Sequence, residues 1–423
     1  MAGAAKPRRK TPAAAKGHKL PEPIPEGFEV SDTFKKGWKI GTKIGSGGFG
    51  TVYFVFTVSF LSILIILASE AGKKDYDYVV KVEYHDNGPL FAEMHCYHSI
   101  GKPTQLAEWI KKKKLPYLGL SPCYGFGSFE YNNSKYRFMI IERFDKDLQH
   151  LFEENGKRFP PKAVYLIGLS LLNVLEYIHN AGYIHGDIKP ANLLLGRKKG
   201  TENQVYLVDM GLACKYLRDG VHKKECPDPK KAHNGTPEFT SRDAHRGCFS
   251  RRSDLEILCY NLLQWLAGEL PWEKYVPDNK KLQQQKEKYM QDIDALLAEL
   301  FGNENEPVGM RKLLTYVCKL TFEDEPDYNL CRKILKDELK RIGADGDTTL
   351  EFQFPKKKAT TKAAKAPVLT NKENTKASKP TKEKRKPEPE VQLDPGMIPT
   401  PAMLEIMNKK VDEGKSSKSR RKK

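Results

Sequence analysis

Four short motifs occur in a fixed order along the chain, and their order and spacing constrain the fold more than any other feature of the sequence. They are residues 45–52 (GSGGFGTV), 79–81 (VVK), 185–192 (HGDIKPAN) and 209–211 (DMG). Each motif alone has an ordinary explanation as a turn or a strand end. Four of them in this order and spacing are not expected by chance.

The glycine-rich run at residues 45–52 fits the pattern G-x-G-x-x-G-x-V. Glycines allow a tight strand-turn-strand hairpin whose backbone amides can reach the phosphates of ATP. Alone this is a weak signal, because Rossmann loops and other glycine-rich turns share the spacing. The residues expected to contact ATP here are Ile44, Gly45, Gly47, Gly48, Gly50 and Val52.

Lys81 and Glu93 form a candidate ion pair. Lys81 follows the glycine-rich run in a β-type stretch, where its ammonium would hold the α- and β-phosphates. Glu93 lies in the helical-looking run at residues 90–98 and would fix the direction of Lys81. An isolated Lys-Glu pair is usually a surface salt bridge, but the preceding phosphate loop favours the functional interpretation.

The third and fourth motifs carry the remaining candidate catalytic and metal-binding residues. Asp187 would accept or orient the proton of a substrate hydroxyl, and Lys189 would neutralise the transferred phosphate. Asn192 and Asp209 supply oxygen ligands of the kind that Mg²⁺ prefers. Asp187, Lys189 and Lys81 are therefore the expected catalytic set.

Hydrophobic periodicity divides the chain into a small sheet-forming part and a larger helical part. Short β-type runs alternate with glycines over residues 38–82, and helical patterns dominate over residues 163–339. The pattern predicts one α+β, bilobal domain at residues 30–345. Its β-rich N-lobe is expected at about residues 36–141 and its helical C-lobe at about residues 145–345.

The two ends of the chain are basic, and the middle is neutral. The net charge of +18 divides into +6 in residues 1–20, +12 in residues 355–423 and zero between them. Both ends are rich in Lys, Pro and Ala and cannot bury much apolar surface, which predicts disordered tails at residues 1–29 and 346–423. Cationic tails suit contact with nucleic acid or nucleosomes; a merely solvated tail is the alternative.

Eight cysteines are scattered without a C-x-x-C pair or a metal-ligand spacing, and the N-terminus lacks the apolar stretch of a secretory signal. These two observations predict reduced thiols in a cytosolic or nuclear protein.

Together the motifs resemble those of protein kinases, and more narrowly of the casein-kinase-1-like group that contains the vaccinia-related kinases. Signatures similar to that family stand at residues 86–91 (DNGPLF), 136–140 (YRFMI), 183–189 (YIHGDIK), 204–209 (QVYLVD) and 238–241 (EFTS). Residues 250–256 (SRRSDLE) and 270–272 (LPW) mark the wider group. The resemblance covers about residues 30–345 and implies a bilobal protein-kinase fold that uses ATP and Mg²⁺.

The resemblance also assigns roles to further residues. It implies that Ile141 is the gatekeeper and that Glu142 to Phe144 form the adenine hinge. It also implies that Thr236 braces Asp187 and Lys189, and that Asp254 ties the catalytic loop, residues 185–192, to a buried helix. Gly186 departs from the general kinase pattern, because many kinases have an arginine there that grips a phosphate on the activation loop. Activity without that phosphate is therefore expected.

An almost wholly apolar run, residues 54–68 (FVFTVSFLSILIILA), follows the glycine loop directly. A membrane span needs about 20 such residues, so an anchor is the less favoured interpretation. A long strand with an apolar hairpin is another, although it would expose a hydrophobic patch. The favoured hypothesis is that residues 54–66 are a translated intron or a gene-model error, because their removal leaves an ordinary strand end, GTVYLASE.

The resemblance implies a serine/threonine protein kinase that acts on nuclear and chromatin proteins, such as histone H3 and the barrier-to-autointegration factor, with roles in the cell cycle and at the nuclear envelope. Basic blocks at residues 384–386 and 420–423 suit nuclear import, so a nuclear and partly cytoplasmic monomer without a membrane contact is expected. Two alternatives remain: a pseudokinase scaffold, if the insertion disables ATP binding, and a chromatin-binding module formed by the tails.

Overall fold

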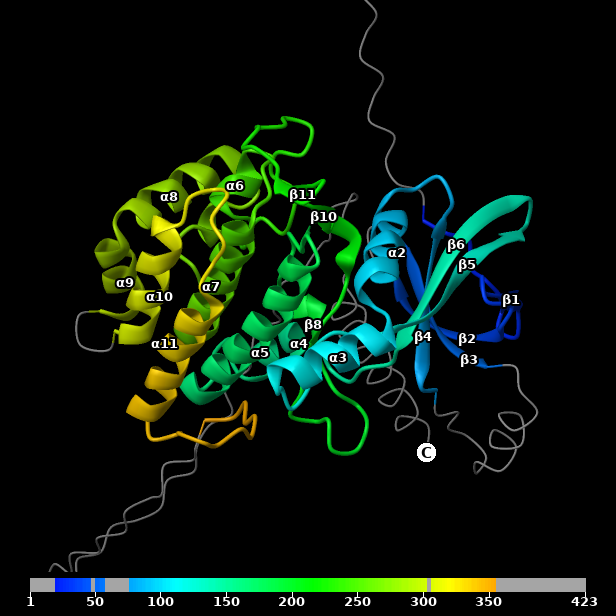
Figure 1. The fold of residues 1–423 in the computed structure, drawn as a ribbon, viewed down its shortest axis with the longest axis horizontal. Coiled ribbons are helices and arrows are strands. Elements are labelled where there is room, and N and C mark those ends of the chain that lie inside the picture. The colour runs from blue at the N-terminus through cyan, green and yellow to red at the C-terminus, as the bar shows by residue number, and fades with distance from the viewer. Residues whose placement is uncertain (1–19, 47–49, 58–75, 303–305, 355–423) are drawn as a thin grey trace, which may run out of the picture. The chain divides into compact units, whose positions relative to one another are not determined.

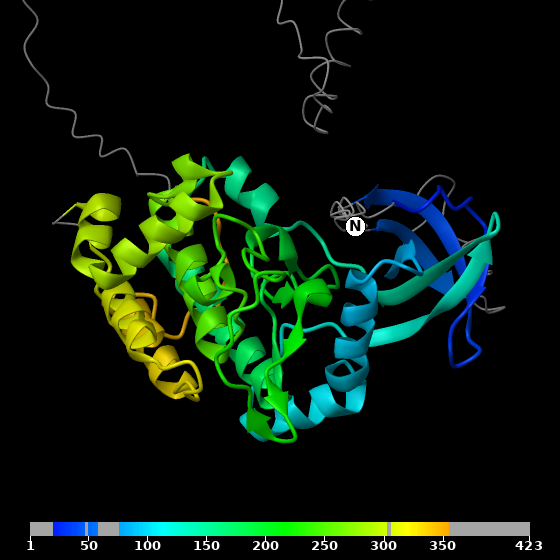
Figure 2. The ribbon, with the colours of Figure 1, turned by 90° about the horizontal axis from the view of Figure 1, so that it is seen from above.

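The computed structural model describes residues 20–46, 50–57, 76–302 and 306–354. Within them, a six-stranded sheet and a helix-rich part form two lobes of one compact unit (Figure 1). Figure 2 shows the blue strands on one side and the green and yellow helices on the other, with the cyan helices at the junction. The predicted α+β, bilobal fold is confirmed.

The N-lobe is an antiparallel sheet with the strand order β1-β2-β3-β4-β6-β5. Its strands are β1 (Glu29–Ser31), β2 (Gly37–Ser46), β3 (Thr51–Thr57), β4 (Tyr78–Tyr84), β5 (Cys123–Tyr131) and β6 (Ser134–Glu142). Successive side chains of a strand point to opposite faces, so alternate residues such as Val55, Val80 and Val82 form one buried layer. Val52 pairs with Lys81 across β3 and β4, which places the end of the glycine hairpin beside the lysine.

Helices α2 (Pro89–Ile100) and α3 (Pro103–Lys113) connect β4 to β5. Each begins with a proline in its first turn, where the missing N–H costs no helical hydrogen bond. The buried residues of α2, among them Leu90, Glu93 and Tyr97, recur at helical spacing. This face carries Glu93 toward the sheet and fixes its position relative to β4.

The C-lobe is built around α5 (Pro161–Asn180) and α7 (Arg251–Ala267). Its other helices are α4 (Leu148–Glu154), α6 (Arg242–His245), α8 (Asn279–Gln291), α9 (Ile293–Phe301), α10 (Val308–Lys319) and α11 (Tyr328–Arg341), with short 3-10 turns η1 (Pro190–Asn192), η2 (Met210–Leu212) and η3 (Glu273–Tyr275). Three pairs of short strands complete it: β7 (Tyr183–Ile184) with β10 (Cys214–Lys215), β8 (Leu193–Leu195) with β9 (Val205–Leu207), and β11 (Leu217–Arg218) with β12 (Val221–His222).

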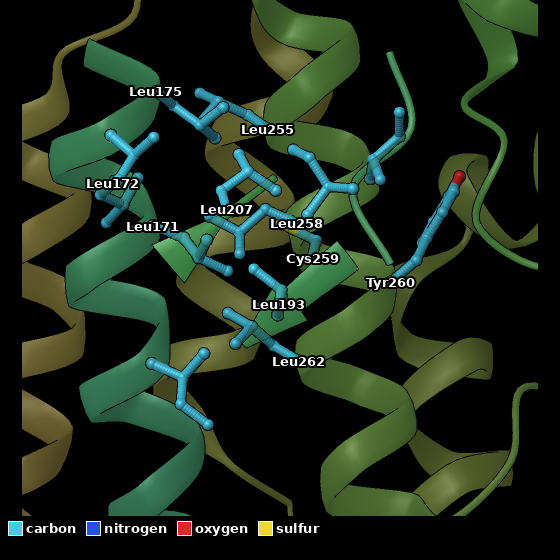
Figure 3. Close-up of a cluster of buried hydrophobic side chains, with 14 of the residues drawn as sticks. Leu171, Leu172, Leu175, Leu193, Leu207, Leu255, Leu258, Cys259, Tyr260 and Leu262 are labelled. Atoms are coloured by element: carbon cyan, nitrogen blue, oxygen red, sulfur yellow. The ribbon is translucent and has the colours of Figure 1, made fainter. Parts of the chain in front are cut away.

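Leucines fill the space between α5 and α7 (Figure 3). The side chains are Leu171, Leu172 and Leu175 of α5, Leu255, Leu258 and Leu262 of α7, and Leu193 and Leu207 of the β8–β9 pair. All are at most 1 % exposed, and each contributes about 1.5–3 kcal/mol by leaving water. The strands that flank the catalytic motifs are thus anchored in the core. Helix α5 is long and apolar enough to cross a membrane, but 67 % of its apolar window is buried, as in a core helix.

The packed chain extends into both ranges predicted to be disordered tails, residues 1–29 and 346–423. Ile24 is 4 % exposed and belongs to the core of the N-lobe. The ring of Phe352 packs against that of Phe159 in the C-lobe, with centroids 5.0 Å apart. Ile24 lies among prolines and glutamates, and Phe352 lies in the short alternating run Leu350, Phe352 and Phe354. The polar composition around both assigned them to the tails, so both domain boundaries were set too far inside. The outer parts of both predicted tails lie outside the described residues.

The apolar run after the glycine loop begins as part of the sheet. Strand β3 continues to Thr57, which pairs with Trp38 of β2, and Val55 is fully buried. The strand interpretation therefore holds for residues 54–57. Residues 58–66 lie outside the described residues, and the hypothesis that residues 54–66 are a translated intron stays a prediction.

Candidate active site

A cavity of about 630 Å³ lies between the sheet of the N-lobe and the segments that follow β6 and η1. The predicted site residues on its lining are Ile44, Gly50, Val52, Lys81, Glu93, Ile141, Glu142, Phe144, Asn192 and Asp209. Gly45 lies in β2 but not on the lining, and Gly47 and Gly48 lie outside the described residues. The remaining wall includes apolar side chains such as Val79 and Leu194, which suit a planar, largely apolar ring.

Lys81 is held between two carboxylates at the edge of the cavity. Its Nζ donates to Glu93 Oε2 at 2.7 Å and to Asp209 Oδ1 at 3.0 Å. Burial alone would lower the pKa of Lys81, but the charges of Glu93 and Asp209 outweigh burial and hold the pKa above its ordinary value. The ammonium is therefore charged at neutral pH and fixed in direction, as the sequence predicted for this pair.

Asp209 adopts a left-handed backbone conformation, with φ of 65°. This conformation is uncommon for a residue other than glycine, although aspartate adopts it more readily than most. Burial would raise the pKa of Asp209, but the Lys81 ammonium outweighs burial and lowers it. Within the described residues, Lys81 and the Gly211 amide both hydrogen-bond Oδ1, so Oδ2 remains for a cation.

Asp187 is the centre of a hydrogen-bonded group formed by the catalytic loop and the later loop that contains Thr236. Its Oδ1 accepts hydrogen bonds from the backbone N–H and the hydroxyl of Thr236, at 2.9 and 2.8 Å. Its Oδ2 accepts a hydrogen bond from Lys189 Nζ at 2.8 Å. Asn192 Nδ2 donates to the backbone oxygen of Asp187 at 2.9 Å, which joins this group to the lining of the cavity.

Asp254 of α7 fastens the catalytic loop to the core of the C-lobe. Its carboxylate is fully buried and accepts hydrogen bonds from the amides of His185 and Gly186, at 2.7 and 2.9 Å. His179 of α5 lies 2.9 Å from the same carboxylate. Gly186 has φ of +79°, a conformation that favours glycine, so the turn itself explains a glycine here.

The structure brings to this region two residues for which the sequence indicated no role, Phe54 and His179. The guanidinium of Arg143 lies 4.5 Å from the ring centroid of Phe54, and both residues line the cavity. Phe54 belongs to the apolar run that was interpreted as an insertion, so its pattern gave no signal of a cavity wall. His179 was missed because one histidine in an apolar helix has no distinctive spacing.

The residues present fit a magnesium ion that is bound together with a nucleotide. Asp209 Oδ2 and the Asn192 side chain provide oxygen donors on the cavity lining. No group of three or more His, Cys, Asp or Glu side chains that could hold a metal occurs in the described part of the chain. A set of two donors suits Mg²⁺, which is commonly held by one or two protein oxygens, substrate phosphates and water.

Comparisons with known proteins identify the family. The family model for the protein kinase domain matches residues 126–345. Nucleosomal histone kinase 1 of Drosophila melanogaster is 42% identical over 357 residues, which cover 83% of this chain and 57% of that protein. The human serine/threonine-protein kinase VRK2 is 42% identical over 319 residues, or 75% of this chain and 60% of that protein. This chain belongs to the vaccinia-related kinase family. The solved structure of vaccinia related kinase 3 matches this kinase with a TM-score of 0.65 and 27% identity, over 77% of this chain and 95% of that one.

The vaccinia-related kinases are serine/threonine protein kinases, so the resemblance predicted from the motifs is confirmed. The chain spans 57% and 60% of the lengths of the fly and human relatives. The activities of those longer proteins are therefore assigned to this chain only as a proposal.

Proposed function

We propose that this vaccinia-related kinase transfers the γ-phosphate of ATP to serine and threonine hydroxyls of proteins. The observation that carries the proposal is the joined arrangement of Lys81, Glu93 and Asp209 beside the cavity. Lys81 is charged, directed by two carboxylates and placed on the lining. A scaffold that does not bind nucleotide has no need to keep a buried carboxylate such as Glu93 in this position.

On the nucleotide side, Ile44, Val52 and Ile141 would enclose the adenine, and the backbone of residues 142–144 would hydrogen-bond its edge. Lys81 would hold the α- and β-phosphates, with Glu93 fixing its direction. Mg²⁺ would supply positive charge on the phosphate oxygens, with Asp209 and Asn192 as its protein ligands. Gly45, Gly47, Gly48 and Gly50 are the residues proposed to cover the phosphates.

On the protein-substrate side, Asp187 would orient the attacking hydroxyl and accept its proton. The hydroxyl oxygen then bonds to the γ-phosphorus as the bond from that phosphorus to the bridging oxygen of ADP breaks. Lys189 would neutralise charge on the phosphoryl group in transit. Thr236 holds Asp187 Oδ1 by two hydrogen bonds, which keeps the carboxylate in one orientation.

Chromatin proteins are the proposed substrates, with histones foremost. The fly relative is named a nucleosomal histone kinase, which supports histone substrates and a nuclear location for this chain as well. The net charge of +12 in residues 355–423 would hold the enzyme near nucleic acid and raise the local substrate concentration. The proposal further includes barrier-to-autointegration factor as a substrate, and roles in the cell cycle and at the nuclear envelope. It also includes a monomeric state.

The test is magnesium-dependent transfer of labelled phosphate from ATP to histone H3 by the purified full chain, with EDTA as the control. Deletion of residues 355–423 should leave this transfer intact and reduce retention on chromatin, because the proposed site residues all precede residue 355 and the deleted segment carries a net charge of +12. A wild-type chain without transfer would favour the scaffold alternative, unless a variant that lacks residues 54–66 is active.

Basal activity should not require a phosphate on the activation loop. Gly186 occupies the place of the arginine that grips this phosphate in many kinases, and its amide is already held by Asp254. Protein from bacteria, treated with phosphatase and then freed of it, should phosphorylate histone H3 at a rate close to that of untreated protein. A preparation that stays silent until its loop is phosphorylated would contradict this prediction.

A further inference from the structure

Lys286 of α8 is a lysine whose side chain is buried in the C-lobe, with a relative exposure of 0%. Lysine is almost never fully buried unless its ammonium is paired. Within the described residues, no salt bridge joins Lys286 to a carboxylate. Its Nζ instead donates to the backbone oxygens of Pro237 at 2.6 Å and Thr240 at 2.8 Å.

The surroundings of Lys286 are arranged for a hydrogen-bond donor. The rings of Tyr260 and Trp272 lie 5.6 and 5.7 Å from Nζ, and His245 Nε2 lies 3.4 Å from it. Burial lowers the pKa of Lys286 to about 7, against the opposing charges of Glu256 and Glu238. An ammonium carries three N–H groups and a neutral amine carries two, so either form can serve both carbonyls.

The backbone that Lys286 holds leads directly to Asp187. Pro237 and Thr240 belong to the loop that begins at Thr236, and Thr236 binds Asp187 Oδ1 by its amide and its hydroxyl. Trp272 Nε1 donates to the backbone oxygen of Glu238, which follows Pro237 in the same loop, at 2.9 Å. Lys286 and Trp272 thus bind three backbone carbonyls of the five-residue loop at residues 236–240, while the first residue of this loop, Thr236, binds the Asp187 carboxylate.

Core packing does not explain a lysine at this position. Burying an amine costs free energy that an apolar side chain of similar length would not incur. The two carbonyls that Lys286 satisfies would otherwise be left without a donor inside the C-lobe. What the lysine contributes is therefore the conformation of the loop.

We propose that Lys286 is a positioning residue for phosphoryl transfer: it holds the loop at residues 236–240 in the conformation in which Thr236 orients Asp187. This inference rests on the proposed kinase function and deepens it. None of residues 236–240 lies on the lining of the nucleotide cavity. The effect of Lys286 should therefore appear on the protein-substrate side of the reaction and leave ATP binding unchanged.

The test is Lys286→Met in the full chain, assayed with ATP and histone H3. Methionine keeps an unbranched side chain and removes the donor, so kcat should fall by about tenfold, the factor that ~1.4 kcal/mol produces, while the KM for ATP stays within about twofold. Lys286→Gln retains an N–H₂ donor on a shorter chain and should recover part of kcat. The exposed Lys288→Met on the same helix is the matched control and should behave as wild type.

Each outcome decides between the proposals. A wild-type chain without activity contradicts the proposed function itself. Active wild type with an unchanged, folded Lys286→Met variant contradicts only the positioning role. Two results would overturn the inference and assign Lys286 to the stability of the C-lobe. One is a KM for ATP that rises by the same factor as kcat falls; the other is the absence of a cooperative thermal transition in both Lys286 variants.

Discussion

Asp187→Asn should lower kcat for histone phosphorylation by about 10³-fold, within the range typical of a general acid–base residue. Asparagine has nearly the same shape, and its oxygen can still accept the two hydrogen bonds from Thr236. It cannot take a proton from the substrate hydroxyl, and its N–H₂ group faces Lys189, which loses its acceptor. Steady-state kinetics with separate titrations of ATP and histone H3 measure the effect.

The binding of ATP should survive this substitution, because Asp187 is not on the lining of the cavity. Calorimetric titration with a non-hydrolysable ATP analogue and Mg²⁺ checks this point. Asp219→Asn is the matched control, since the Asp219 side chain is 96% exposed and its positive φ suits asparagine. A loss of less than about tenfold in the Asp187 variant would mean that another group accepts the proton.

Asp243→Ala should destabilise the C-lobe by about 3–5 kcal/mol, the usual cost of removing one partner of a buried ion pair. The Asp243 side chain is 4% exposed and receives two parallel hydrogen bonds from Arg252, each 2.8 Å long. Arg246 and the Ser250 hydroxyl bind the same carboxylate, at 2.7 and 2.9 Å. Chemical denaturation followed by circular dichroism measures the free energy of unfolding.

The pH dependence of the destabilisation caused by Asp243→Ala shows whether it comes from the lost ion pair or from lost packing. Burial would raise the pKa of Asp243, but Arg252 and Arg246 outweigh burial and lower it. Its stabilisation is therefore complete above the unfolded-state pKa of about 3.9 and is lost as the pH falls through the lower folded-state pKa. The difference in the free energy of unfolding between wild type and variant should therefore shrink as the pH falls below the unfolded-state pKa of about 3.9. Asp337→Ala breaks only an exposed pair with Lys333 and should leave stability unchanged.

The motifs alone predicted contacts between residues close together in the chain, whereas the distant contacts of Thr236 with Asp187 and of Asp254 with residues 185–186 were expected only from the family resemblance. The run at residues 185–192 must bring an acid, a lysine and an amide into one turn, so its spacing is fixed by the geometry of that turn. The pairing of Lys81 with Glu93 could be predicted because the two residues lie on consecutive elements, β4 and α2, joined by a short connection that limits how the helix can pack on the strand. All eight cysteines are free in the structure, and their reduced state stays a prediction.

The contacts that the sequence did not predict join residues far apart in the chain. Lys286 reaches backbone carbonyls more than 40 residues away, and a carbonyl has no signature in a sequence. On its own helix, Lys286 is one of several lysines in a polar stretch, so its burial is a property of the tertiary fold alone. The outer limits of the domain were missed for another reason, because both ends were assigned from their composition: Ile24 lies among prolines and glutamates, and the alternating run Leu350, Phe352 and Phe354 is short and precedes a long polar stretch.

Asp254 ties the motion of the catalytic loop to the cooperativity of the whole lobe. Its carboxylate is shared by two amides of the loop and by His179 of α5, which is also hydrogen-bonded to Tyr328 of α11. If the loop lifted away, this fully buried carboxylate would lose two of its three hydrogen-bonding partners and keep only His179. Local opening of the loop therefore costs more free energy than the opening of a surface loop whose amides are bonded only to water. The orientation of the catalytic residues therefore depends on the packing of the hydrophobic core that holds Asp254 in place.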